Sequence, residues 1–257
     1  FGLVVAGGAY EAPLPGLPDP GPIVGWGTPI VRALTDLTAI ATIGWLLAAT
    51  VLDPSGKNGV VSHVGRQDLR RATGFATAWA VLAVVQMLFE LANVLGVPLV
   101  DAITPGTVAT YANEIAATRA VLVMAVLAVV VAIGAFVTST TGASAAWLLI
   151  AVAAAALPAL AGHSAGLGDH ALATSAGVAH IVAAVIWMGG LVGLAVHAAR
   201  RDMPLQRAAQ RFSRIALLAI VMLAASGFAN AYTRLDVASQ LFTTGYAPER
   251  YAELAEP

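Results

Sequence analysis

Six ionisable side chains lie within or beside long apolar stretches, where a charged group is costly and usually functional. They are His163, Asp169, His170, His180, Glu90 and Asp36. Imidazole and carboxylate groups together suit copper, with zinc and nickel as alternatives. The first three fall in one short polar segment between two apolar runs, so they are expected to cluster. The chain has no HxxxH-type pair, so the metal prediction rests on how these residues are brought together.

The composition excludes an ordinary water-soluble protein. Of the 257 residues 59% are hydrophobic and 11% are charged, with a mean hydropathy of +0.82, whereas soluble domains have about 45–50% apolar and about 25% charged residues. The net charge of −1 gives no field that would attract nucleic acid. Cysteine is absent, which excludes disulfides, thiolate metal sites and cysteine nucleophiles. The chain is therefore predicted to be an integral membrane protein.

The elements that must position the six side chains are membrane-spanning helices, each of about 20 apolar residues. Six runs are long enough, and a shorter run at residues 1–10 is interpreted as the end of a helix that begins before this chain. The full runs are 28–52, 72–97, 117–138, 144–162, 171–198 and 210–234. We expect an all-α polytopic bundle that forms one domain over 1–257, incomplete at its N-terminus.

Lys and Arg are unevenly distributed among the connecting segments. Segments 53–71 and 199–214 are basic, whereas 11–27, 98–116 and 163–170 contain no Lys or Arg. Because basic connections stay in the cytoplasm, we expect a bacterial cytoplasmic (inner) membrane protein with the His163–His170 segment outside.

Three of the candidate ligands are expected at one depth. At about 1.5 Å per residue, Asp36, Glu90 and His180 lie about 10–13 Å from the predicted outer ends of three helices. Structural alternatives exist for each. Asp36 could pair with Arg32 one turn away, Glu90 shares a helix face with the packing residue Met87, and His180 could bond a serine or a backbone carbonyl.

Two further groups of residues are interpreted as structural. Gly189, Gly190 and Gly193 form a small-residue face of the kind that lets a neighbouring helix approach closely. His63 lies in the basic segment 53–71, and His197 lies at the predicted end of its helix beside Arg200 and Arg201. We interpret both histidines as interfacial residues without a functional role.

Four short motifs resemble one known family. They are Gly162-His163-Ser164; His180 followed by Trp187-Met188-Gly189-Gly190-Leu191; Arg211-Phe212-Ser213; and Ser226-Gly227 with Asn230. Their order resembles the copper resistance protein D family, in the actinobacterial form that is often fused to a caa3-type cytochrome c oxidase assembly domain. The resemblance implies a multi-pass membrane protein that transports or delivers copper, and its histidine motifs carry over onto His163 and His180 only. The family continues beyond Tyr246 into a further apolar helix, whereas an acidic tail follows here, so two alternatives stay open: the chain lacks this last helix, or the domain is incomplete at its C-terminus.

The expected function is copper transport or delivery without enzymatic activity, since nothing in the chain resembles an ATP-hydrolysing module. Copper would bind at the outward His163–Asp169–His170 cluster and pass to His180 near Glu90 and Asp36. The expected partners are the lipid bilayer, copper ion or an extracytoplasmic copper chaperone, and an oxidase assembly domain or subunit. Two alternatives remain open: a non-catalytic subunit for assembling the copper site of cytochrome oxidase, and a b-type haem redox protein with histidine axial ligands.

Overall fold

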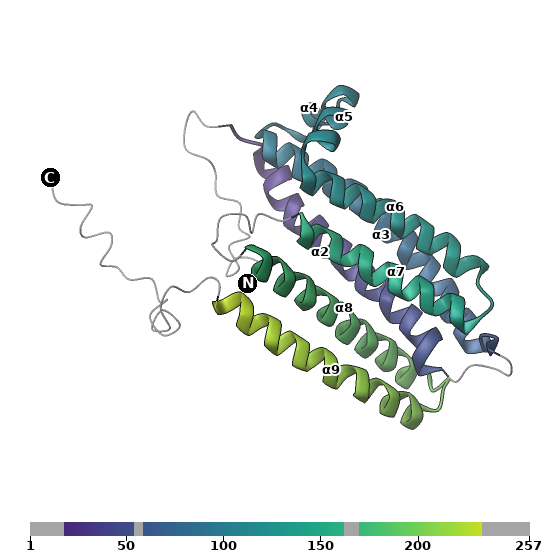
Figure 1. The fold of residues 1–257 in the computed structure, drawn as a ribbon. Coiled ribbons are helices and arrows are strands. Elements are labelled where there is room, and N and C mark those ends of the chain that lie inside the picture. Colours follow the sequence, from purple (N-terminus) through teal and green to yellow (C-terminus); the bar gives the residue numbers. More distant parts are fainter. Residues whose placement is uncertain (1–17, 54–58, 162–169, 233–257) are drawn as a thin grey trace.

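The computed structural model describes residues 18–53, 59–161 and 170–232 (Figure 1). Within these ranges six helices are long and apolar enough to cross a membrane, which confirms the predicted all-α polytopic bundle. They are α2 (Gly21–Leu47, continued by the π-helical turn η1, Ala48–Leu52), α3 (His63–Leu95), α6 (Ala116–Val137), α7 (Thr141–Leu160), α8 (His170–Arg200) and α9 (Leu205–Tyr232). The shorter apolar run predicted at residues 1–10 lies outside the described residues.

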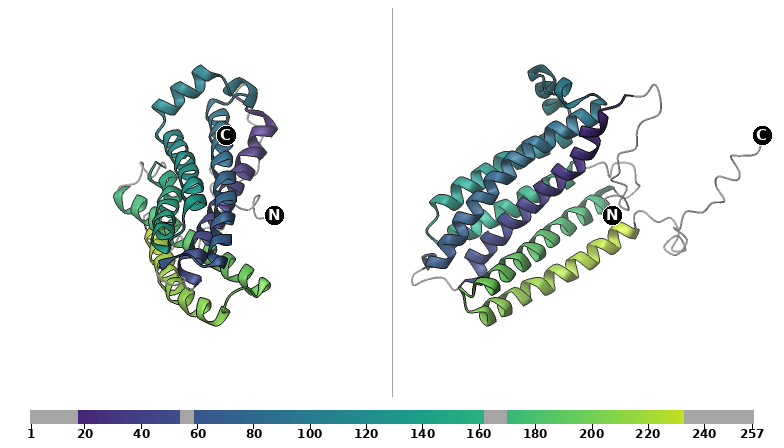
Figure 2. Two further views of the ribbon diagram at one scale, coloured as in Figure 1. Left: turned by 90° about the vertical axis from the view of Figure 1, so that its right-hand side faces the viewer. Right: turned by 180° about the vertical axis from the view of Figure 1, so that it is seen from behind.

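The six long helices lie side by side along the length of the molecule (Figures 1 and 2). Helix α2 packs mainly against α3 and α8, α3 also packs against α6, and α9 packs against α8. At one end of the bundle α2, α6 and α8 finish and α3, α7 and α9 begin (Figure 1). We call it the basic end, because Arg66, Arg70, Arg71, Arg200 and Arg201 belong to these helix termini. The other end is called the opposite end.

Two helices begin earlier than their apolar runs predict. Helix α2 starts at Gly21 rather than at residue 28, because a proline in its first turn has no N–H to leave unpaired. Helix α3 starts at His63 rather than at residue 72, where the Ser62 hydroxyl caps it by accepting a hydrogen bond from Gly65 N at 3.0 Å. The apolar runs therefore mark the membrane-crossing parts and miss the polar turns that extend each helix.

The segment predicted as a plain connection over 98–116 is largely helical. It forms α4 (Leu99–Ala102) and α5 (Pro105–Glu114), which lie across the opposite end of the bundle (Figure 1). The Thr104 hydroxyl caps α5 by accepting a hydrogen bond from Thr107 N at 3.2 Å. Such short helices lack the long apolar run on which the prediction relied.

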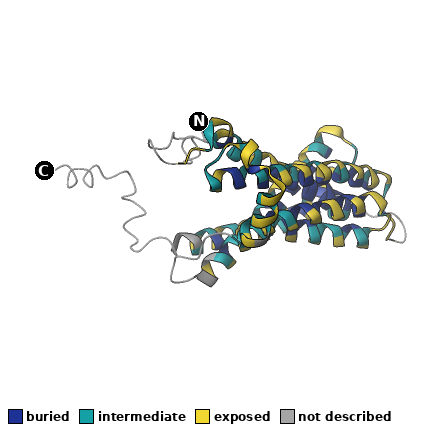
Figure 3. Ribbon diagram, turned by 90° about the horizontal axis from the view of Figure 1, so that it is seen from above, coloured by how far each residue is buried: buried dark blue, intermediate teal, exposed yellow. Residues whose placement is uncertain are grey.

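Alanines dominate the core, and their small side chains allow the helices to approach closely. The main cluster of buried residues joins α2, α3, α6 and α7 around the fully buried Trp79, and a smaller cluster holds α9 against η1 through Phe212. Figure 3 shows the buried residues gathered where the helices converge. At the opposite end the ribbons of α8 and α9 stand apart from α2 and α3 (Figures 1 and 2).

Candidate functional site

His180 is held by a serine of the neighbouring helix. Its Nδ1 atom lies 3.1 Å from the Ser226 hydroxyl of α9. That hydroxyl also lies 3.1 Å from the Leu223 carbonyl, to which it can donate, and it can then accept a hydrogen bond from Nδ1–H. In that tautomer Nε2 keeps the lone pair that a metal-ligating histidine requires. The side chain is exposed rather than part of the core.

The two candidate carboxylates come from α2 and α3. The Glu90 carboxylate accepts a hydrogen bond from Gln86 Nε2 at 2.7 Å, and the charges of Arg32 and Glu90 both act on Asp36. Side chains lean toward the N-terminus of their own helix. Because α2 and α3 are antiparallel, Asp36 and Glu90 lean toward each other.

The depths of these groups follow from two close helix contacts. Gly27 packs against Phe89, which places Glu90 near the level of Gly27, about nine residues or ~13 Å from Asp36 along the α2 axis. Gly189 packs against Gly44 and Ile40 of α2, which runs parallel to α8 (Figure 1). His180 is nine residues before Gly189 and therefore lies level with residues 31–35 of α2. The three groups span about two and a half turns, with His180 between the carboxylates, rather than sharing one level.

The described residues contain no group of three His, Asp or Glu side chains that could hold a metal ion. His163 and Asp169 lie outside the described residues, and His170 is described only as the first residue of α8. The α2–α3 carboxylates and His180 belong to helix pairs that diverge at this end (Figure 2). The structure therefore gives positions for Asp36, Glu90 and His180 without joining them into one site.

The glycine face of α8 lies against α2 and α9. A Cβ atom on Gly189 would come within 2.9 Å of backbone atoms of Gly44 and Ile40, and one on Gly193 would lie 3.1 Å from Gly44 O. A Cβ atom on Gly190 would lie 2.1 Å from the Phe212 ring of α9. These glycines thus allow the backbones of α2 and α8 to touch.

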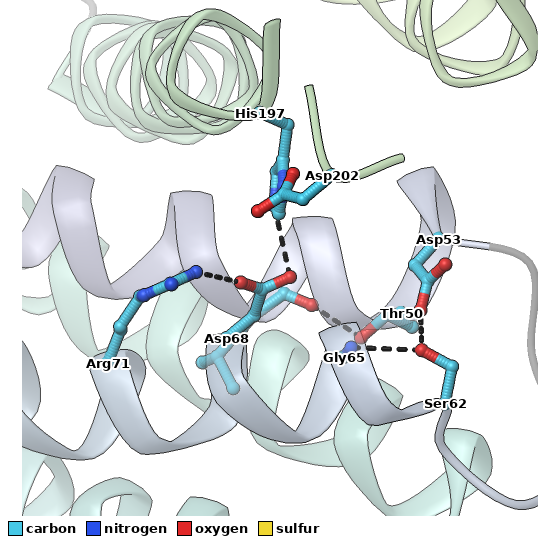
Figure 4. A network of polar contacts seen from close by, with 9 residues as sticks. Thr50, Asp53, Ser62, Gly65, Asp68, Arg71, His197 and Asp202 are labelled. Carbon is cyan, nitrogen blue, oxygen red and sulfur yellow. Dashed lines mark hydrogen bonds and ion pairs between the residues drawn. The ribbon is translucent and has the colours of Figure 1, made fainter. Parts of the chain in front are cut away.

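The most extensive polar cluster lies elsewhere, at the basic end (Figure 4). His197 of α8 places Nε2 3.0 Å from Asp68 Oδ2 of α3 and Nδ1 2.6 Å from Asp202 Oδ1, in the α8–α9 connection. Asp68 also accepts a hydrogen bond from Arg71 at 2.7 Å. The side chains of His197 and Asp68 are fully buried. The interpretation of His197 as an interfacial residue was therefore wrong, whereas His63 is exposed as expected.

An aromatic side chain of α2 completes this cluster. The Trp45 ring meets His197 edge-on, with 5.8 Å between ring centroids. The guanidinium groups of Arg71 and Arg200 lie over the same ring, at 4.8 and 5.8 Å from its centroid. The cluster thus links α2, α3 and α8 with the α8–α9 connection. A sequence signal for this cluster existed, since Asp68 is an acid placed among Arg66, Arg70 and Arg71.

One family model matches the chain, that of the copper resistance protein D-like N-terminal domain, over residues 23–173. No curated protein and no solved structure matches it. The matched range covers α2 to α7 and ends before the motifs at His180, Trp187 and Ser226, so it supports the family independently of them. It spans more than half of the chain, which therefore belongs to the copper resistance protein D-like family.

Proposed function

We propose that this protein carries or delivers copper across a bacterial cytoplasmic membrane. In this proposal the ion is taken up at the opposite end by His163, Asp169 and His170. It then passes to His180, about 15 Å further along α8 from His170, and Glu90 of α3 and Asp36 of α2 are proposed as further ligands along the path. The family and the six apolar helices support a copper-related membrane protein, and the path through these residues is our proposal.

The observation that carries the proposal is the bonding of His180. The exposed His180 places Nδ1 3.1 Å from the Ser226 hydroxyl, and the tautomer in which Nδ1–H donates to that hydroxyl would leave the Nε2 lone pair to a metal ion. A histidine that only packed against neighbouring side chains would be expected to have a buried ring, whereas His180 is exposed. The charge distribution supports the orientation, since basic helix ends stay in the cytoplasm and the opposite end would then face outward.

The test is copper binding by the purified full chain, with Cu(I) and Cu(II) measured separately. We expect His163→Ala and His180→Ala each to weaken or abolish binding, and the exposed His63→Ala, at the basic end, to leave it unchanged. Unchanged stoichiometry and affinity in both site variants would refute the proposed path and favour a non-catalytic assembly subunit. A Soret band in the optical spectrum would instead support the b-type haem alternative.

The bond from Ser226 gives a second, finer prediction. In Ser226→Ala the His180 ring loses the partner that fixes its tautomer, so copper affinity is expected to fall about tenfold, at the low end of the effect of outer-shell partners. Isothermal titration of the purified variant measures this. Ser213→Ala, which changes an exposed serine of the same helix, serves as the control and should bind as the unmodified chain does. Equal affinity in both variants would show that Ser226 does not orient a ligand.

A further inference from the structure

The His197 cluster at the basic end needs one more proton than its groups ordinarily carry. A carboxylate oxygen faces each ring nitrogen, Asp202 Oδ1 at Nδ1 and Asp68 Oδ2 at Nε2. Ionised carboxylates only accept, so each contact is favourable only when a proton lies in it. A neutral imidazole has a single N–H and fills one contact. The other contact requires a second proton on the ring.

Burial strengthens this requirement. Neither Asp68 Oδ2 nor His197 Nε2 has a hydrogen-bond partner within the described residues; their 3.0 Å contact is an ion pair, and both side chains are fully buried. With the second proton on the ring, the charges of Asp68, Asp202, Arg71 and the imidazolium add up to zero. Without it, the buried Asp68 Oδ2 faces the lone pair of Nε2 at 3.0 Å, and two buried acceptors left without a proton between them are unfavourable.

The other groups around the cluster do not supply that proton. From α2 the cluster meets the uncharged Trp45 ring, and from α8 and α3 the guanidinium groups of Arg200 and Arg71 lie over this ring. From α9, Arg211 donates instead to the Val51 carbonyl at 3.1 Å. These arginines add positive charge around the cluster, but none of them donates a hydrogen bond to Asp68 Oδ2.

We propose that Asp68, His197 and Asp202 form a proton-binding site that ties the α8–α9 connection to α3 at the basic end. One bound proton closes the contact, and its release frees the end of α8 and the α8–α9 connection from α3, and so loosens the start of α9. The site is separate from the copper path, because His197 lies 17 residues and so about 25 Å along α8 from His180. It therefore does not depend on the proposed copper function.

The proton can be observed directly in the full chain labelled with ¹⁵N-histidine. At pH 8 an ordinary histidine is neutral, since its unperturbed pKa is about 6.5. We expect one of the five histidines to retain protons on both nitrogens. Asp68→Asn should abolish this signal, because the amide N–H can donate to Nε2 without an extra proton. Absence of the signal at pH 8, or its persistence in Asp68→Asn, would overturn the proposal.

The effect on the helices can be measured by thiol alkylation, because the chain contains no cysteine. Ala208→Cys places a thiol at a fully buried position of α9 near the connection, and Ala154→Cys provides a fully buried reference in α7. Relative to the reference, we expect alkylation at Ala208→Cys to become about tenfold faster when His197→Gln is added, because local opening is then favoured. Adding Asp68→Asn should instead keep it slow and independent of pH. An unchanged rate with His197→Gln would show that the site does not hold α8 and α9.

Discussion

Gly44→Ala is expected to lower the free energy of unfolding by about 1–3 kcal/mol, the usual cost of overpacking a close contact. The new methyl group would lie 2.4 Å from the Gly189 carbonyl oxygen. Backbone atoms, unlike the end of a flexible side chain, cannot turn away, so α2 and α8 must separate along their whole contact. The loss can be measured by SDS titration of the protein in mixed micelles.

The matched control for this prediction is Gly177→Ala, on α8 itself, where an added Cβ atom meets nothing within 4 Å. There we expect stabilisation of up to about 1 kcal/mol, the ordinary helix preference for alanine over glycine. Gly189→Ala should lower the free energy of unfolding about as much as Gly44→Ala does. The double variant Gly44→Ala/Gly189→Ala should lose less stability than the sum of the two single losses. Both methyl groups enter the same α2–α8 contact, and once the first has separated the helices the second meets less crowding. Equal effects at Gly44 and Gly177 would contradict a backbone contact between α2 and α8.

The membrane-crossing elements could be predicted because each is encoded locally, as a continuous apolar run of sufficient length. Residues outside such runs were predicted less well. The first turns of α3 are polar and depend on the Ser62 cap, and α4 and α5 are too short for an apolar run. Gly189 could be recognised as a packing residue, but its partner Gly44 belongs to a helix far away in the sequence.

His180 and His197 show the same limit: contacts that a side chain makes with another helix could not be predicted from the sequence. His180 was recognised because an ionisable residue deep in an apolar run is unusual, yet its tautomer depends on Ser226, which lies 46 residues away. His197 stands beside arginines and resembled a surface residue. Its burial depends on Asp68 and Trp45, contributed by two other helices. Depth along one helix can be counted from sequence, whereas the register between helices is set by contacts such as Gly27 with Phe89.

Asp68→Ala is expected to have the largest effect on stability, a loss of about 3–5 kcal/mol, as for removing one partner of a buried ion pair. Asp68 is fully buried and bonds Arg71 at 2.7 Å. Alanine would leave that guanidinium group without its carboxylate and would open a gap beside His197 Nε2. The same SDS titration measures the loss, and Asp101→Ala, which removes an exposed carboxylate of α4, should change stability by less than about 1 kcal/mol.

The comparison with Asp68→Asn decides why the alanine variant loses stability. An asparagine can donate to His197 Nε2 from its amide nitrogen and accept from Arg71 at its amide oxygen, so it keeps both contacts without a carboxylate charge. We therefore expect Asp68→Asn to retain most of the stability that Asp68→Ala loses. If the two variants were equally unstable, the negative charge itself would be required beside Arg71. Asp68 would then stabilise the basic end as a simple ion pair, and the contact with His197 would contribute little.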